Sequence, residues 1–140
     1  MSVLNAKLAD ISTKVEPVAV GAHRAQIKEV IQGKSKKSSV PMVTITYKIN
    51  DEDDPYNKRE LSDYFTLETK EGEPNEAGLR GLKRVIVAAL GEDRANAEDF
   101  DTDELKGVDV EIVTIQEPYE DPDTKETSVN SKVKKVVGIK

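Results

Sequence analysis

The clearest pattern along the chain is an alternation of apolar and polar side chains from Val40 to Ile49. One face of this segment carries Val43, Ile45, Tyr47 and Ile49, and the other carries Met42, Thr44, Thr46 and Lys48. A period of two residues is typical of a strand that packs one face on a core. We therefore predict a strand over residues 40–49, with Tyr47 in the core.

Four further segments also predict strands, although their patterns are less regular. The first covers residues 18–31, and its alternation changes phase near Arg24, which predicts a bulge or a bend there. Residues 58–67 place Phe65 on an apolar face and Tyr64 on a polar one. Residues 108–116 and 132–139 complete the set. The polar segment between them, 117–131, contains Pro118 and Pro122 and predicts a long hairpin loop.

An apolar stripe at helical spacing predicts one helix over residues 76–90. Asn75 is a suitable N-cap, and Gly91 is a natural C-terminal stop. Gly78 and Gly81 lie inside this helix, where we expect them to allow close packing on the strands.

A shorter turn of helix is predicted over residues 102–106, because Asp101 and Glu104 have the spacing of a capping box. Residues 1–17 end at a proline and are expected to form a short helix or an arm. The remaining residues, 18–140, are then one domain, which agrees with the total length of 140 residues.

The predicted order is three strands, one helix and two strands. This is the order of the OB-fold, a mainly β, five-stranded Greek-key barrel with a helix between strands three and four. A bend in a long first strand is also expected in that fold, because the strand serves both halves of the barrel. The alternative is an open α+β sheet with the helix packed on one face.

Composition excludes several classes of chemistry. The chain has no Cys, so disulfides, thiolate metal sites and cysteine nucleophiles are ruled out. Its one histidine, His23, has no evident partner and is expected to be structural. No pair of groups suggests acid–base or nucleophilic catalysis. We expect a protein that is not an enzyme and that uses no cofactor and no metal.

An acidic run at residues 51–54 invites comparison with a calcium loop. The EF-hand pattern fails, because Tyr56 stands where the loop needs Gly and Ser62 where it needs Glu. A solvated turn is the expectation. No apolar run reaches the length of a membrane-spanning helix, and the first residues lack the pattern of a signal peptide, so we expect a cytoplasmic protein without membrane association.

Charge is distributed unevenly around a formal net charge of −6. Residues 1–50 carry +5, residues 51–126 carry −15, and residues 127–140 carry +4. A fold that brings the two basic ends together would form a positive surface on an acidic protein. Chance placement of solvated charges is the alternative.

An OB-fold binds nucleic acid across strands two and three, between the loop that joins strands one and two and the loop that joins strands four and five. At these places the sequence has cations that can pair with phosphates and aromatic rings on which a base can stack. The candidate nucleic-acid-binding residues are Lys34, Lys36, Lys37, Thr44, Thr46, Lys48, Lys58, Arg59, Tyr64 and Tyr119. For each of them, ordinary solvent exposure is the alternative.

The layout over about residues 15–140 resembles the phage-encoded single-stranded-DNA-binding proteins with an OB-fold. The segments that carry the resemblance are 17–21 (PVAVG), 25–27 (AQI), 41–49 (PMVTITYKI), 78–84 (GLRGLKR) and 103–107 (DELKG). The resemblance implies a protein that coats single-stranded DNA during replication and recombination. Many such proteins end in an acidic tail that recruits partners, whereas this chain ends in a basic segment, 132–140, so no tail function is carried over.

Two functional hypotheses follow. The first is sequence-independent binding of single-stranded DNA in phage DNA replication or recombination, in the cytoplasm of a bacterial host, with replication or recombination proteins and self-association as further contacts. The second is a protein-interaction module or a virion structural or assembly component built on a small β-barrel.

Overall fold

The computed structural model describes residues 17–35, 39–120, 122, 123, 125 and 127–139. Within these residues the chain forms five strands, β1 (Gly21–Lys34), β2 (Pro41–Ile49), β3 (Glu60–Thr66), β4 (Asp109–Glu120) and β5 (Thr127–Gly138). The helical elements are α1 (Glu76–Leu90), α2 (Glu92–Ala95) and the 3₁₀ helix η1 (Thr102–Leu105). The protein is mainly β, and its long helix lies between β3 and β4, as the sequence predicts.

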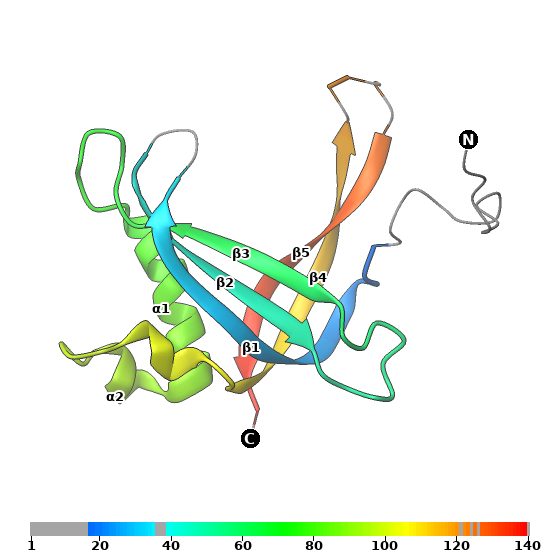
Figure 1. Cartoon of the computed structure of the whole chain (residues 1–140), viewed down its shortest axis with the longest axis horizontal. Coiled ribbons are helices and arrows are strands. Elements are labelled where there is room, and N and C mark those ends of the chain that lie inside the picture. The colour runs from blue at the N-terminus through cyan, green and yellow to red at the C-terminus, as the bar shows by residue number, and fades with distance from the viewer. Residues whose placement is uncertain (1–16, 36–38, 121, 124, 126, 140) are drawn as a thin grey trace, which may run out of the picture.

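The five strands form one open antiparallel sheet in the order β3-β2-β1-β4-β5 (Figure 1). The first part of β1 pairs with β4, and its longer second part pairs with β2. The strands at the two ends of this order, β3 and β5, also approach each other, so the sheet is strongly curved. The central strand therefore joins two parts of the sheet that pack against each other.

The irregularity in β1 lies at Lys28 and not near Arg24, where the sequence predicts it. The register with β2 shifts between Ile27 and Glu29. At this point the Ile27 carbonyl accepts a hydrogen bond from the Gly107 N–H at 2.8 Å, and its N–H donates to the Val108 carbonyl at 2.9 Å. Because the N–H and the C=O of Ile27 are hydrogen-bonded to the segment before β4, the regular pairing of β1 with β2 is interrupted and the bulge forms at the next residue.

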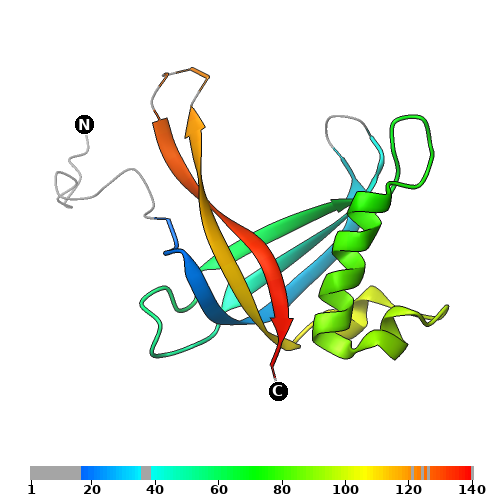
Figure 2. The same cartoon turned by 180° about the vertical axis from the view of Figure 1, so that it is seen from behind.

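The predicted long loop at 117–131 is wrong. Both strands continue into it, so that Pro118 of β4 lies opposite Val129 of β5, and this hairpin extends past the other strands (Figures 1 and 2). Pro118 has no N–H, but β4 pairs with β1 only as far as Thr114. Beyond that residue one side of β4 faces no described strand, and a proline is tolerated at such an edge.

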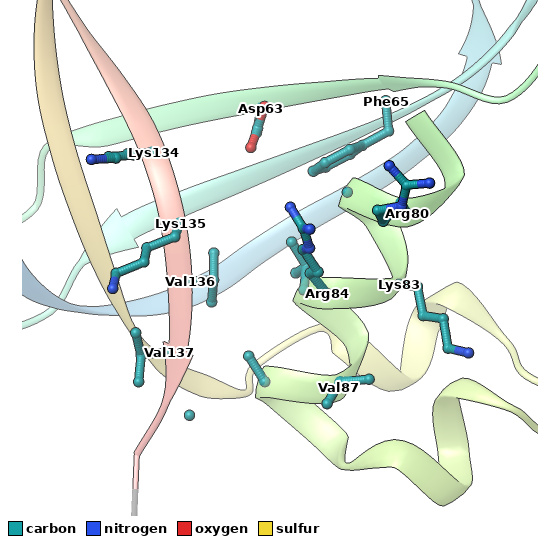
Figure 3. Close-up of a pocket in the computed structure, with 14 residues that line it drawn as sticks. Asp63, Phe65, Arg80, Lys83, Arg84, Val87, Lys134, Lys135, Val136 and Val137 are labelled. Atoms are coloured by element: carbon teal, nitrogen blue, oxygen red, sulfur yellow. The ribbon is translucent and has the colours of Figure 1, made fainter. Parts of the chain in front are cut away.

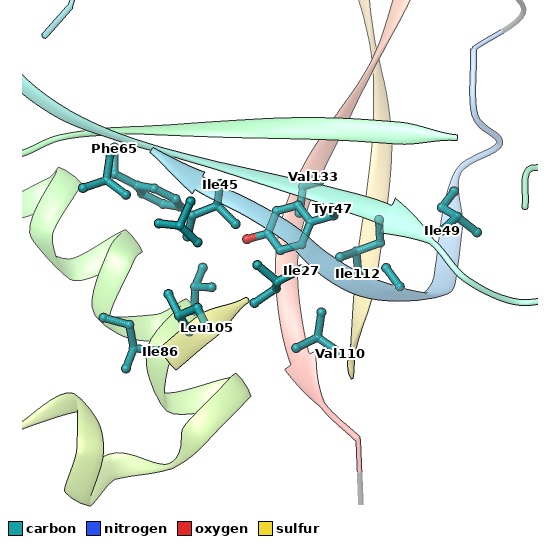
Figure 4. Packing of buried hydrophobic residues seen from close by; sticks show 14 of the residues in the cluster. Ile27, Ile45, Tyr47, Ile49, Phe65, Ile86, Leu105, Val110, Ile112 and Val133 are labelled. Carbon is teal, nitrogen blue, oxygen red and sulfur yellow. The ribbon is translucent and has the colours of Figure 1, made fainter. Parts of the chain in front are cut away.

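The core lies between the inner face of the sheet and α1 (Figure 4). The predicted core positions Tyr47 and Phe65 are buried, with 0% and 7% of their surface exposed. Helix α1 contributes Val85 and Ile86, and η1 contributes the fully buried Leu105. The apolar stripe of α1 and the odd-numbered residues of β2 thus meet in one cluster, as their patterns predict.

Helix α1 has the predicted bounds, residues 76–90. The Asn75 side chain accepts a hydrogen bond from the Gly78 N–H, and the Gly91 N–H donates to the Val87 carbonyl. Gly78 and Gly81 face β3, where a side chain would meet the Thr66 backbone or the Phe65 ring. The close packing expected from these glycines is confirmed. Among the residues that the structure describes, no helix is long and apolar enough to cross a membrane.

The segment between α1 and β4 contains the predicted capping box. Asp101 and Glu104 form it at the start of η1, which is one residue shorter than the predicted helix. The short helix α2 is not predicted. Its Arg94 guanidinium donates two hydrogen bonds to the Glu104 carboxylate, at 3.0 and 2.7 Å, which ties α2 to η1.

Candidate nucleic-acid interface

Several of the predicted binding residues lie together on the side of the sheet that faces away from the core. On β2, Thr44, Thr46 and Lys48 lie opposite Tyr64, Ser62 and Glu60 of β3, respectively. These six residues, with Glu29 and Ile31 of β1, are called the outer face below. All eight are exposed or partly exposed, because they alternate with the core residues along each strand.

Tyr64 is the most prominent aromatic side chain of the outer face. Its side chain is 63% exposed, and the residue opposite it on the neighbouring strand β2 is Thr44. Thr44 in turn pairs with Ile31 of β1, which is 50% exposed. The exposed phenol ring and the exposed aliphatic side chain lie in one row across three strands, with Thr44 between them. The ring of Tyr64 offers an apolar surface of the kind on which a nucleic-acid base stacks.

Sequence reasoning missed Ile31, which the pattern places on the same face as Ala25 and Ile27. The bulge at Lys28 reverses the alternation, so that Val30 is the buried residue and Ile31 faces outward. The change of phase visible in the sequence is the signal that was available. The position of the bulge is set by backbone contacts with residues 107 and 108, and the sequence does not show these contacts.

The middle of the outer face carries hydroxyl groups and the exposed carboxylate of Glu29, which lies opposite Thr46. Thr46 Oγ1 and Ser62 Oγ are 3.0 Å apart and hydrogen-bonded. Lys28 Nζ lies 2.9 Å from a carboxylate oxygen of Glu60, so this acid is neutralised by its neighbour. Lys48 forms no ion pair with any residue that the structure describes. Its charge is therefore available to an anion that crosses the face.

Lys58 and Arg59 belong to the loop before β3 and not to the strand, which begins at Glu60. Lys58 has a φ of 75°, in the left-handed region that non-glycine residues rarely adopt. Its N–H donates to the Ile49 carbonyl at 2.7 Å, and the Ile49 N–H donates to the Arg59 carbonyl at 2.8 Å. These bonds hold both cations at the end of the outer face that also carries Lys48.

A hollow of about 480 Å³ lies along the free edge of β3, where the start of β5 passes it. We call it the β3–β5 hollow. Its lining includes Arg59, Ser62 and Tyr64 from the β3 side and Val129, Asn130 and Ser131 from β5. The three β5 residues were not predicted as site residues, because from the predicted 117–131 loop only Tyr119 was selected, as an aromatic ring on which a base can stack. The hollow joins Arg59 and Tyr64 into one continuous surface.

The predicted lysine loop is only partly described. Lys34 is exposed at the end of β1, opposite Pro41 and at the end of the sheet away from Lys58. Lys36 and Lys37 lie outside the described residues. Tyr119 belongs to β4, opposite Ser128, and its side chain lies outside the described part of the structure. The structure thus brings together Thr44, Thr46, Lys48, Lys58, Arg59 and Tyr64.

The acidic run at 51–54 is a hydrogen-bonded turn that has a partner in the core. His23 Nδ1 lies 2.5 Å from Asp54 Oδ2, and His23 Nε2 lies 2.9 Å from the Ala19 carbonyl oxygen. Asp54 also accepts a hydrogen bond from the Tyr56 N–H, and the ring of Tyr56 meets the His23 ring edge-on. The histidine is structural, as expected, but its partner was not predicted.

This pair shifts the pKa of both groups. Burial works against a charged His23, but the hydrogen bonds to Asp54 and Ala19 and the charge of Asp54 raise the pKa of His23 above its ordinary value of 6.5. Burial likewise disfavours a charged Asp54, yet the bonds from His23 and Tyr56 lower the pKa of Asp54 below 3.8. The pair therefore acts as an ion pair that fixes the β2–β3 loop, next to Lys58 and Arg59, onto the start of β1.

The chain matches no protein-family model, and no curated protein is significantly similar to it in sequence.

Proposed function

We propose that this protein binds single-stranded DNA without sequence preference, as a non-enzymatic component of phage DNA replication or recombination. The binding surface in this proposal is the outer face together with the β3–β5 hollow. Phosphates would pair with Lys48, Lys58 and Arg59, and bases would stack on Tyr64.

The strand order supports an OB-like interpretation of the fold. In that fold β1 pairs with β2 and β4, and the curved sheet brings β3 close to β5. The chain has these pairings, and β3 and β5 approach each other although they share no ladder of hydrogen bonds. We therefore interpret the sheet as an OB-type barrel that is open between β3 and β5.

The observation that carries the functional proposal is the position of Tyr64. It is an exposed aromatic residue on the third strand, with Ile31 two strands away on one side and the β3–β5 hollow on the other. Arg59, in the same hollow, supplies a cation within the same surface. Stacking with a nearby cation is the arrangement by which proteins bind single strands regardless of sequence.

Fluorescence anisotropy with a labelled poly-dT of about 30 nucleotides tests the proposal, since a single OB-fold covers about 4–16 nucleotides. We expect binding that weakens steeply with salt and that a duplex of equal length does not compete away. Poly-U of equal length distinguishes DNA from RNA. Absence of binding at low salt would contradict the proposal and favour the protein-interaction alternative.

Two variants of one residue locate the stacking contact. Tyr64→Phe keeps the ring and should bind poly-dT within about twofold of the wild type, whereas Tyr64→Leu keeps apolar bulk without the ring and should weaken binding about tenfold. Because Tyr64 is largely exposed, neither change should alter the unfolding midpoint appreciably. Equal affinities for the two variants would exclude stacking on Tyr64.

A further inference from the structure

A second depression lies on the opposite side of β3 from Tyr64. It has a volume of about 740 Å³ and is bounded by α1, β5 and the inner residues of β3 (Figure 3). We call it the basic groove. Asp63 and Phe65, which line it, alternate with Tyr64 along β3, so the groove and the outer face lie on opposite sides of the strand. A ligand can occupy one without covering the other.

The groove exists because α1 bridges the two end strands of the sheet. Near its start, Gly81 lies against the Phe65 ring of β3, where a Cβ would be 3.1 Å from the nearest ring atom. Near its end, Ala88 lies against Gly138 of β5, where a Cβ on the glycine would be 2.5 Å from the Ala88 carbonyl oxygen. Between these two contacts the helix, β3 and β5 leave the space open.

The rim of the groove is strongly positive on an acidic protein. Helix α1 contributes Arg80, Lys83 and Arg84, and β5 contributes Lys134 and Lys135. In Figure 3 the side chains of Lys134 and Lys135 extend from β5 on the side away from α1, and Lys83 lies on the far side of α1, so the two arginines are the cations closest to the space. None of these five forms an ion pair with another residue that the structure describes. Figure 3 shows Arg84 rising from α1 towards the space beneath Asp63 and Phe65. The net charge of the whole chain is −6, so this concentration of free cations is local.

Asp63 is the one carboxylate among the residues that line the groove. Burial raises its pKa above the ordinary value, and the hydrogen bond from the Tyr64 N–H and the charge of Lys132 partly offset this effect. The remaining lining is apolar and includes Phe65, Val85 and Val136. The groove therefore combines an apolar floor with an excess of cations at its rim.

The strand β5 adds a further feature, because it pairs with β4 alone among the described strands. Its other side presents backbone N–H and C=O groups next to the groove. An extended peptide can hydrogen-bond to such an edge while its side chains enter neighbouring pockets. A nucleic acid lacks this complementarity, and the groove offers no exposed aromatic ring for a base, because Phe65 is only 7% exposed.

From these features we infer that the basic groove is a docking site for an acidic segment of a partner protein, one that carries large apolar side chains between its carboxylates. The carboxylates pair with Arg80 and Arg84, and the apolar side chains contact Val87 and Val136, which line the groove and stay exposed or partly exposed. This inference does not depend on the proposed binding of single-stranded DNA. It gives the protein a second surface, separate from the outer face, through which it binds a partner protein.

The test uses the full chain and a fluorescent peptide of about 6 residues, the length of a typical strand, in which Asp and Glu alternate with Leu and Phe. A peptide of this length fits along the part of β5 that lines the groove without reaching residues 129–131. We expect saturable binding to the wild type. A peptide with Lys in place of the acids, and one with Ser in place of Leu and Phe, should each bind at least about tenfold more weakly, because each loses one of the two complementary features. Equal binding of all three peptides would overturn the inference.

Charge reversal then locates the site. Arg80→Glu with Arg84→Glu should weaken peptide binding by at least about tenfold and leave binding of poly-dT within about twofold. The matched control is Lys70→Glu with Lys106→Glu, which changes the net charge equally at exposed positions outside the groove and should leave both affinities unchanged. Thermal unfolding of each variant checks that it is folded.

Three outcomes contradict the inference. Peptide binding that survives the groove variant places the peptide elsewhere. Loss of poly-dT binding in the groove variant, but not in the control, would make the groove part of a nucleic-acid path. Self-association of the wild type that the groove variant abolishes would make a second copy of this chain the occupant, and analytical ultracentrifugation distinguishes that case.

Discussion

Gly78 of α1 lies so close to Thr66 of β3 that a Cβ atom at Gly78 would be 1.9 Å from the Thr66 carbonyl oxygen. No side chain fits at that distance, so α1 sits against β3 only because residue 78 has none. The same helix meets β5 at Gly138. These contacts set the spacing between α1 and both end strands and thereby the shape of the basic groove.

Gly78→Ala is accordingly expected to destabilise the protein, although alanine is ordinarily the better helix former. Displacing α1 from β3 should lower the free energy of unfolding by about 2–3 kcal/mol, the upper range for overpacking a tight contact. Gly33→Ala is the matched control, because a Cβ there meets nothing within 4 Å, and it should change stability little. Urea unfolding measures both. A stability of Gly78→Ala equal to or above that of the wild type would contradict the contact.

The His23–Asp54 pair predicts a pH dependence of stability with a defined sign. Because the pKa of His23 is raised, its contribution is complete below pH 6.5 and is lost as pH rises through the folded-state pKa. Because the pKa of Asp54 is lowered, its contribution is present above pH 3.8 and is lost as pH falls through the folded-state pKa. The pair therefore stabilises the fold most between these two values.

Unfolding experiments from pH 5 to pH 9 test this dependence, and Asp54→Asn should remove the loss of stability on the alkaline side. Since the chain has one histidine, an NMR titration of its ring is assigned without ambiguity. The midpoint in the folded protein is expected above 6.5. A midpoint below that value would mean that burial outweighs Asp54, and stability would then rise with pH through the same range.

Tyr47 carries a buried hydroxyl that has no hydrogen-bond partner among the described residues. Burial, with a smaller effect of Asp63, raises the pKa of this phenol far above its ordinary value, so the group stays protonated. An unpaired buried hydroxyl costs about 1–3 kcal/mol of desolvation. Tyr47→Phe removes it without leaving a partner unsatisfied, and the free energy of unfolding should stay equal or rise. A loss of more than about 1 kcal/mol would show that the hydroxyl has a partner.

Lys58 combines a strained backbone with a position in the proposed interface. A left-handed conformation costs a non-glycine residue about 1–2 kcal/mol, and Lys58→Gly removes that cost. The greater chain entropy of glycine in the unfolded state offsets part of the gain, so the free energy of unfolding should rise by up to about 1 kcal/mol. The same change removes a cation and should weaken poly-dT binding and its salt dependence. Lys70→Gly, an exposed lysine in a turn without positive φ, should do neither.

The sequence predicts most of the secondary structure because local patterns determine it. Asn75, Gly91 and the apolar stripe between them define α1, and the alternation at residues 40–49 defines β2 with Tyr47 inward. The strands at 108–116 and 132–139 were predicted, but their extension through residues 117–131 was not. Pro118 has the local character of a strand breaker, whereas its tolerance depends on where β1 stops pairing with β4.

The candidate site is predictable only in part, for the same reason. Tyr64, Thr44 and Thr46 follow from the period of two in their own strands. Ile31 depends on a bulge that contacts with residues 107 and 108 place at Lys28, and Val129 and Asn130 depend on strand pairing across the hairpin. The basic groove is formed by α1 and β5, two segments about 50 residues apart, so no local sequence motif predicts it.

The measurement that tests the proposed function most directly is an amide NMR titration of the full chain with poly-dT of about 30 nucleotides. Shifts should concentrate on the outer face and the β3–β5 hollow, at Thr44, Arg59, Ser62, Tyr64 and Asn130, and should spare α1. Absence of shifts, or shifts confined to Arg80, Arg84 and Lys134 of the basic groove, would contradict the assignment of the outer face as the surface that binds single-stranded DNA.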